Sequence, residues 1–123
     1  MTWSCWSTSN FFMSRAAWER LGPLGHFRYV LDWEYALRAA IRLPQALCWV
    51  DGSPMLDYRL HGGNTILGGA IRNHIEAAFV LRTAQRRVLA AGGRVSPDAV
   101  LRLKYLDRFV RQESARIQAA ASQ

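Results

Sequence analysis

The spacing of hydrophobic residues in the second half of the chain predicts two long helices joined by a short turn. From about Gly69 to Ala91, apolar residues recur at helical spacing: Ile71, Ile75, Ala78, Phe79, Val88 and Leu89. Gly92-Gly93 ends this helix. Ser96-Pro97 begins the next, because serine caps a helix and proline suits the first helical position. The second apolar stripe is Val100, Leu103, Leu106, Val110 and Ile117. Residues 67–123 are therefore predicted to form a helical hairpin.

Shorter helices are predicted in the first half. Ser14 is a suitable N-cap for a helix over roughly Arg15 to Leu21. Asp32 is predicted to cap a second helix, with Glu34 in the first turn, where the helix dipole favours a negative charge. This helix should end near Leu43-Pro44, because the residue before a proline disfavours the helical conformation.

Four runs in the first half have the residue types of β-strands. β-branched, aromatic and small polar residues alternate over residues 2–8, and short apolar or alternating runs cover 11–13, 46–50 and 55–60. Asp51-Gly52-Ser53-Pro54 separates the last two runs with residues typical of turns. The mixture of strands and helices predicts an α/β or α+β fold for this half.

Composition indicates one domain, or a piece of one, that can bury a core. The chain has 123 residues, of which 50% are hydrophobic. No apolar run reaches the ~18 residues of a membrane span, and no secretory signal precedes the first predicted strand. Cys5 and Cys48 lack metal-ligand spacing, so they are predicted to be buried thiols of a reducing compartment, with a disulfide between them as the alternative. We therefore expect a cytoplasmic protein.

The positive charge is concentrated in the second half. The formal net charge is +7; residues 1–64 carry six arginines and five acids, and residues 65–123 carry ten basic residues and four acids. One hypothesis is a non-catalytic module whose basic helices contact an anionic membrane or nucleic acid. Few aromatic residues lie among these cations, which argues against a stacking platform for single-stranded nucleic acid. The other candidate is peripheral contact at the inner membrane face. The simpler interpretation, which we favour over any partner, is a solvated arginine-rich surface.

Polar residues that could carry chemistry lie at the ends of the predicted strands and helices. In an α/β sheet, sites collect at such ends. Asp32 could act as a general base toward a hydroxyl group, and His61 could bind a metal ion or a phosphate. Arg59 offers a forked donor for a phosphate or carboxylate. The simpler alternatives are that Asp32 only caps its helix and that His61 is an ordinary loop residue.

Four motifs together resemble the C-terminal half of a family 2 glycosyltransferase. They are Ser9-Asn10-Phe11-Phe12-Met13-Ser14-Arg15, Trp18-Glu19-Arg20-Leu21-Gly22, Asp32-Trp33-Glu34-Tyr35-Ala36-Leu37-Arg38 and Tyr58-Arg59-Leu60-His61-Gly62-Gly63-Asn64-Thr65. The resemblance covers roughly residues 4–66. It implies an α/β fold: residues 1–66 as the C-terminal, acceptor-side half of a GT-A-like sheet with flanking helices, and residues 67–123 as a basic helical extension.

The resemblance also implies an activity, the transfer of a sugar from a nucleotide-sugar to an acceptor hydroxyl with inversion. Asp32 matches the catalytic base, and Trp33 would line the acceptor or sugar side. His61 matches the histidine near the diphosphate and its divalent ion, Mg²⁺ or Mn²⁺. The other residues assigned to substrate binding are Asn10, Arg59 and Asn64.

The sequence departs from this family in two respects. Leu31 precedes Asp32 where the family usually has a second acid, and neither an Asp-x-Asp motif nor the nucleotide-binding half is present. The resemblance therefore implies an acceptor-side fragment that does not turn over a sugar donor alone. Half a sheet would present an unpaired edge, which favours self-association.

Overall fold

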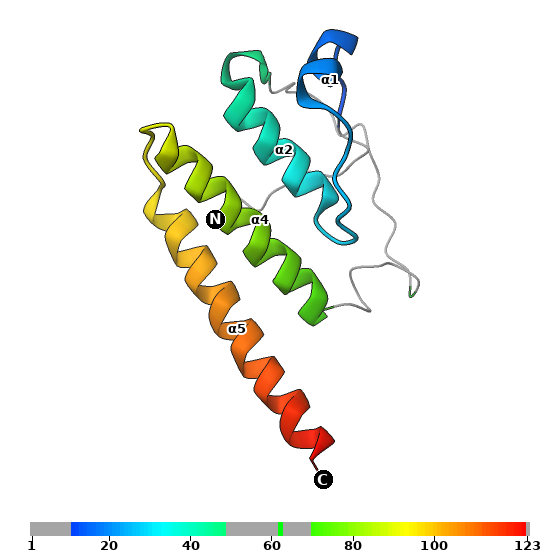
Figure 1. Cartoon of the computed structure of the whole chain (residues 1–123), viewed down its shortest axis with the longest axis vertical. Coiled ribbons are helices and arrows are strands. Elements are labelled where there is room, and N and C mark those ends of the chain that lie inside the picture. Colours follow the sequence, from blue (N-terminus) through cyan, green and yellow to red (C-terminus); the bar gives the residue numbers. More distant parts are fainter. Residues whose placement is uncertain (1–10, 49–61, 63–69, 123) are drawn as a thin grey trace.

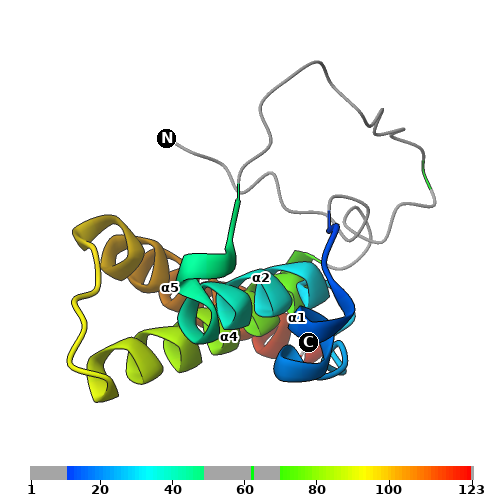
Figure 2. The same cartoon turned by 90° about the horizontal axis from the view of Figure 1, so that it is seen from above.

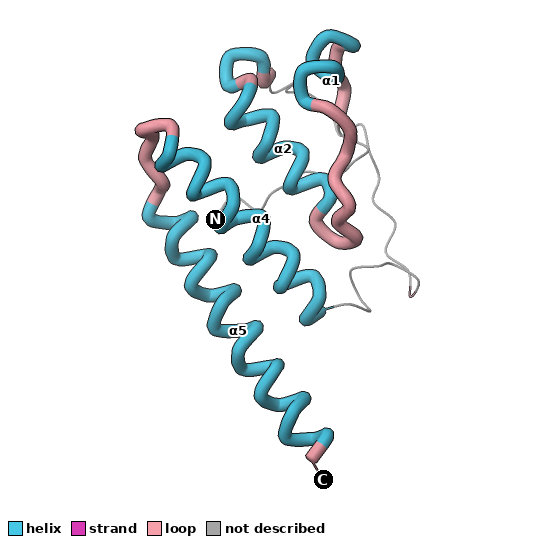
Figure 3. The backbone as a smooth tube through the Cα atoms, viewed as in Figure 1, coloured by secondary structure: helices cyan, strands magenta, loops and turns pink. Residues whose placement is uncertain are grey.

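All regular elements that the structure describes are helices. The computed structural model describes residues 11–48, 62 and 70–122. Its elements are α1 (Arg15–Leu21), α2 (Leu31–Arg42), the short 3₁₀ helix η2 (Pro44–Ala46), α4 (Ala70–Ala90) and α5 (Pro97–Ala121) (Figure 1). Figure 3 shows the same backbone coloured by secondary structure, and none of the described residues lies in a strand.

The helices pack around α4. α4 and α5 run antiparallel as a hairpin, and α2 lies along α4 on its other side (Figures 1 and 2). α1 lies beside the C-terminal end of α2. The segment between them, residues 22–30, returns along α2 to its first residue (Figure 1). The predicted helical hairpin is therefore confirmed, and it forms a bundle with α2.

The predicted helix boundaries are confirmed where serine or glycine determines them. The Ser14 hydroxyl accepts from the Ala17 N–H at 3.2 Å, and the Ser96 hydroxyl accepts from the Ala99 N–H at 3.3 Å. Gly22 ends α1 with a φ of +78°, a conformation that glycine adopts without the steric cost that a Cβ brings.

The start of α2 differs from the prediction. The N-cap is Val30, so Asp32 is the second residue of the helix and does not cap it. Its Oδ1 atom accepts from the N–H of the next residue, Trp33, at 2.9 Å. The predicted end of the helix is confirmed, because α2 stops at Arg42, directly before Leu43-Pro44.

Two hydrophobic clusters hold the helices together. The first joins α2 and the residues before it to the hairpin; its buried members are Val30, Ala77, Ala78, Val80 and Leu106. The second joins α1 to α2 and the residue that follows it; its buried members are Leu21, Tyr35, Ala39 and Leu43. Three of the five buried residues of the first cluster lie on α4, which makes α4 the central helix of the bundle.

The predicted α/β fold is wrong, and with it the resemblance to the GT-A sheet. Residues 11–13 form no strand, because Phe11 packs its ring against Tyr35, 5.8 Å away between centroids, instead of joining a sheet. The run over 46–50 begins in η2, and Leu47 and Cys48 are exposed, so Cys48 is not the buried thiol that was predicted. The buried apolar residues of the described helices pack against one another, so the described core forms from helices alone.

Several predictions lie outside the described residues. These are the strands over 2–8 and 55–60, Cys5, and the boundary between residues 66 and 67. They stay predictions.

Candidate functional site

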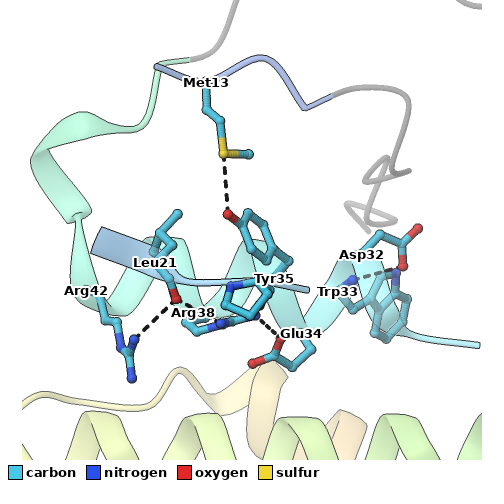
Figure 4. Close-up of polar contacts among 9 residues, drawn as sticks. Met13, Leu21, Asp32, Trp33, Glu34, Tyr35, Arg38 and Arg42 are labelled. Atoms are coloured by element: carbon cyan, nitrogen blue, oxygen red, sulfur yellow. Dashed lines mark hydrogen bonds and ion pairs between the residues drawn. The ribbon is translucent and has the colours of Figure 1, made fainter. Parts of the chain in front are cut away.

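Two of the predicted site residues lie at the first turn of α2, as Figure 4 shows. The Asp32 carboxylate is partly buried, and burial raises its pKa, while its hydrogen bond with the Trp33 N–H acts in the opposite direction. The Trp33 ring is covered by the Arg102 guanidinium of α5, whose carbon lies 5.2 Å from the ring centroid. Trp33 therefore links α2 to the hairpin.

The other predicted site residues, Asn10, Arg59, His61 and Asn64, lie outside the described residues. Whether any of them approaches Asp32 is untested, and so is the predicted Mg²⁺ or Mn²⁺. Among the residues that the structure describes, no three His, Cys, Asp or Glu side chains gather closely enough to hold a metal ion.

The most connected polar side chain of α2 is Arg38, which sequence reasoning did not single out. Its Nη1 donates to the Leu21 carbonyl at 2.9 Å, and its Nη2 donates to the Pro23 carbonyl at 2.9 Å and to Glu34 Oε2 at 2.8 Å (Figure 4). The guanidinium also lies 4.9 Å from the centroid of the Tyr35 ring. Arg38 therefore fastens the segment after α1 to α2, and its charge is neutralised by Glu34.

Tyr35 occupies the centre of the second cluster. Its side chain is 1% exposed, and its hydroxyl donates to Met13 Sδ at 3.4 Å (Figure 4). Burial raises the pKa of this hydroxyl, although the neighbouring Arg38 lowers it. A buried tyrosine, its weak sulfur acceptor and a neutralised arginine together form a structural core.

The α4–α5 hairpin has the opposite character. Arg82 Nη2 and Asp107 Oδ1 form an ion pair at 2.6 Å across the two helices, and both side chains remain partly exposed, at 47% and 32%. Residues three, four or seven positions away on each helix lie on the same face as this pair. We call this set the hairpin face: Ile75, Phe79, Arg82, Arg86 and Leu89 on α4, and Val100, Lys104, Asp107 and Arg111 on α5.

The hairpin face combines large apolar side chains with charged ones. Ile75, Phe79 and Leu89 are 47%, 58% and 59% exposed, and Val100 is 37% exposed. The charged members are four cations and one carboxylate, a balance of +3. Arg86, Lys104 and Arg111 are exposed, and none of these three forms an ion pair with another described residue. The face is therefore amphipathic, with cations available to a partner.

Sequence reasoning found the cations of this face but not its apolar members. Ile75, Phe79 and Leu89 belong to the helical stripe that the spacing identified, yet they are exposed. Of that stripe Ala78 is buried as predicted, and Ala77 and Val80, which the spacing did not identify, join it in the core. The alanines allow a close helix approach. The sequence did contain a signal for this exposure, because an arginine lies within four residues of each exposed apolar side chain of the face.

Comparisons with protein-family models, with curated proteins and with solved structures gave no significant match. The glycosyltransferase function implied by the four motifs is wrong on the present findings: the described residues form a helical bundle where that enzyme needs a sheet, and no relative supports the activity. Within the described residues, no helix combines the length and apolar character that a bilayer crossing requires.

Proposed function

We propose that this protein is a peripheral binding module that attaches to an anionic lipid surface through the hairpin face. The observation that carries the proposal is the combination, on one exposed side of two packed helices, of large apolar side chains with arginine and lysine. Such helices lie in the plane of a membrane interface, with apolar groups at the acyl boundary and cations among the headgroups.

Charge supplies the attraction. A basic residue near an anionic surface contributes about 1 kcal/mol to binding. Arg86, Lys104 and Arg111 together would contribute about 3 kcal/mol by this rule, with further area from Ile75, Phe79 and Leu89. Arg82 contributes less, because Asp107 already neutralises it.

The aromatic content of the hairpin supports lipid over nucleic acid. Binding to single-stranded nucleic acid needs several exposed aromatic rings for base stacking. Of the three aromatic residues of Phe or Tyr type on α4 and α5, Phe109 is occupied by a stack with His74, with the ring centroids 4.0 Å apart. Phe79 and Tyr105 remain exposed, and they belong to different helices.

The test is co-sedimentation with vesicles. We expect binding to vesicles that contain phosphatidylglycerol and much weaker binding to phosphatidylcholine alone, with affinity that falls as salt rises, because salt screens surface charges. The triple variant Arg86→Gln, Lys104→Gln, Arg111→Gln should weaken the partition coefficient by about 100-fold, from about 1 kcal/mol per charge.

A second triple variant controls for net charge. Arg20→Gln, Arg94→Gln, Arg108→Gln removes the same number of exposed cations from outside the hairpin face, none of them ion-paired with another described residue, and it should retain most of the binding. Equal losses in the two triple variants, or equal binding to neutral vesicles, would refute the proposal. If size-exclusion chromatography instead showed a dimer that Ile75→Ser and Leu89→Ser dissociate, the face would be an interface between two copies.

A further inference from the structure

A second surface feature lies beside the hairpin face and shares Phe79 with it. It is a groove of about 200 Å³ between α2 and α4. Its lining comes from one face of each helix and from the segment before α2: Phe27, Glu34, Leu37, Arg38, Ile41, Phe79, Val80, Thr83, Ala84 and Arg87. The two helices run in the same direction along it (Figure 1).

The two ends of the groove differ in chemistry. At one end the Phe27 and Phe79 rings meet, with centroids 6.0 Å apart. Eight residues further along α4, about 12 Å at the rise of a helix, Arg87 lines the groove. Between them the lining is mainly aliphatic, from Leu37 and Val80. A linear molecule with an apolar tail and a compact head would match both ends.

The charges that line the groove determine whether the head of the ligand should be anionic or cationic. Arg38 is bonded to Glu34 and to two backbone carbonyls, so this pair contributes no net charge. Arg87 is exposed and forms no ion pair with another described residue. The lining thus carries one unneutralised positive charge, next to the Thr83 hydroxyl, which can donate a hydrogen bond.

We infer that this groove binds an unbranched alkyl chain that ends in a single anionic group, with the chain between Leu37 and Val80 and the anion at Arg87. A volume of about 200 Å³ is below the usual 300–1,000 Å³ of sites for larger ligands, so the occupant is a short chain. The anion can be a carboxylate or a phosphate. The groove shares Phe79 with the hairpin face, but its test uses a free ligand in the absence of vesicles and so does not depend on membrane binding.

Calorimetric titration with four ligands of equal chain length tests the head group. Octanoate and octyl phosphate should bind saturably, whereas octanol and octylamine should bind at least several-fold more weakly. Preference for octanoate over octyl phosphate would assign the groove to free carboxylates, and the reverse would assign it to phosphate-bearing lipids. Equal affinity for octanol and octanoate would overturn the inference, since Arg87 would then have no role.

Adjacent arginines provide the matched variants. Arg87→Gln should weaken octanoate binding about tenfold, the usual worth of a hydrogen bond to a charged group, and should leave octanol binding unchanged. Arg86→Gln, one position away on the hairpin face, should leave octanoate binding unchanged. Equal effects of the two substitutions would overturn the assignment, whatever the result with vesicles.

Filling the groove tests the position of the chain. Ala84→Leu places a larger side chain inside the groove, reduces its free volume and should abolish octanoate binding. Ala90→Leu places the same side chain at an exposed site at the end of α4 and should leave octanoate binding unchanged. Helical circular dichroism of both variants verifies folding. Backbone amide shifts at Ile41 and Thr83 should move with octanoate in the unchanged protein; saturable binding without those shifts would place the ligand elsewhere and refute the inference.

Discussion

The α1–α2 region and the α4–α5 hairpin use their arginines in opposite ways. The side chain of Arg38 on α2 is 11% exposed, and its guanidinium donates to two carbonyls and one carboxylate. Arg86 and Arg111 on the hairpin are exposed, without a described ion-pair partner. A positive net charge therefore does not identify a binding surface by itself; the surface is found by asking which cations the fold has left unpaired.

Tyrosines show the same contrast. Tyr35 is 1% exposed at the centre of a cluster, whereas Tyr105 on α5 is 62% exposed. The first region is held by interactions directed inward. The hairpin helices also pack extensively on each other, but they direct several large side chains outward. Substitutions should thus affect stability in the first region and binding in the second.

The largest expected effect is that of Tyr35→Ala. Removing a fully buried aromatic side chain should lower the free energy of unfolding by about 3–5 kcal/mol, because a cavity replaces its contacts. Urea denaturation followed by circular dichroism measures this. Tyr105→Ala, the matched control, should change stability by less than about 0.5 kcal/mol. If Tyr35→Ala fails to fold, Tyr35→Phe, which loses only the bond to Met13, should cost less than about 1 kcal/mol. Similar losses for Tyr35→Ala and Tyr105→Ala would erase the contrast.

Arg38→Met should cost about 2 kcal/mol, because Glu34 loses its partner in a largely buried ion pair and the Leu21 carbonyl keeps only the longer bond from Arg42 at 3.4 Å. The same substitution at Arg108, an exposed residue of α5, should be nearly neutral. Denaturation curves of the two variants compare the regions directly. A near-neutral Arg38→Met would mean that water replaces the guanidinium.

Glu76→Gln should cost about 1 kcal/mol. Both carboxylate oxygens of Glu76 accept from the Arg28 N–H, and Oε2 also accepts from the Tyr29 N–H at 2.8 Å, so this side chain ties the segment before α2 to α4. Hydrogen exchange at the Tyr29 amide should accelerate. Glu113→Gln, which removes an exposed ion pair with Arg116, should leave stability almost unchanged. Unaltered exchange at Tyr29 would show that the tie is dispensable.

The smallest expected effect is that of Asp32→Asn, which should raise stability where the other substitutions lower it. Because burial raises the pKa of Asp32 above its ordinary 3.8, the fold prefers the protonated carboxyl. The stabilisation from this preference is present below 3.8 and is lost as pH rises through the raised value. Asp32→Asn should therefore be more stable than the unchanged protein at neutral pH, and the difference should vanish in acid.

Asp98→Asn is its control. Asp98 lies in the exposed first turn of α5, where a negative charge favours the helix, so the substitution should destabilise by about 0.5 kcal/mol at neutral pH. Denaturation curves recorded at neutral pH and below pH 3.8 compare the free energy of unfolding of the two variants with that of the unchanged protein. Destabilisation by Asp32→Asn at neutral pH would contradict the burial argument.

Local signals in the sequence predicted helices well and the fold class badly. Ser14, Gly22, Ser96 and Pro97 act within one turn, so their effect is visible from neighbouring residues alone. The strand prediction at 11–13 failed because a run of three apolar residues suits either a strand or an extended segment that packs on a helix, and only the distant Tyr35 decides.

The hairpin face was half visible in the sequence. Its cations could be counted, but the exposure of Ile75 and Phe79 depends on which side of α4 meets α2 and α5. Arg38 could not be recognised at all, because its partners at Leu21 and Pro23 are brought to it by the return of the chain along α2. The assignment of Asp32 as a helix cap failed by two residues, since Val30 already occupies the cap.

The central place of α4 has a consequence for the order of events during synthesis. The amides of Arg28 and Tyr29 find their acceptor on Glu76, 48 and 47 residues later. Until α4 has left the ribosome, Val30 and the apolar side of α2 lack the α4 residues that bury them in the folded protein. A translational pause placed before residue 70 should therefore prolong the time during which a nascent chain is bound by chaperones.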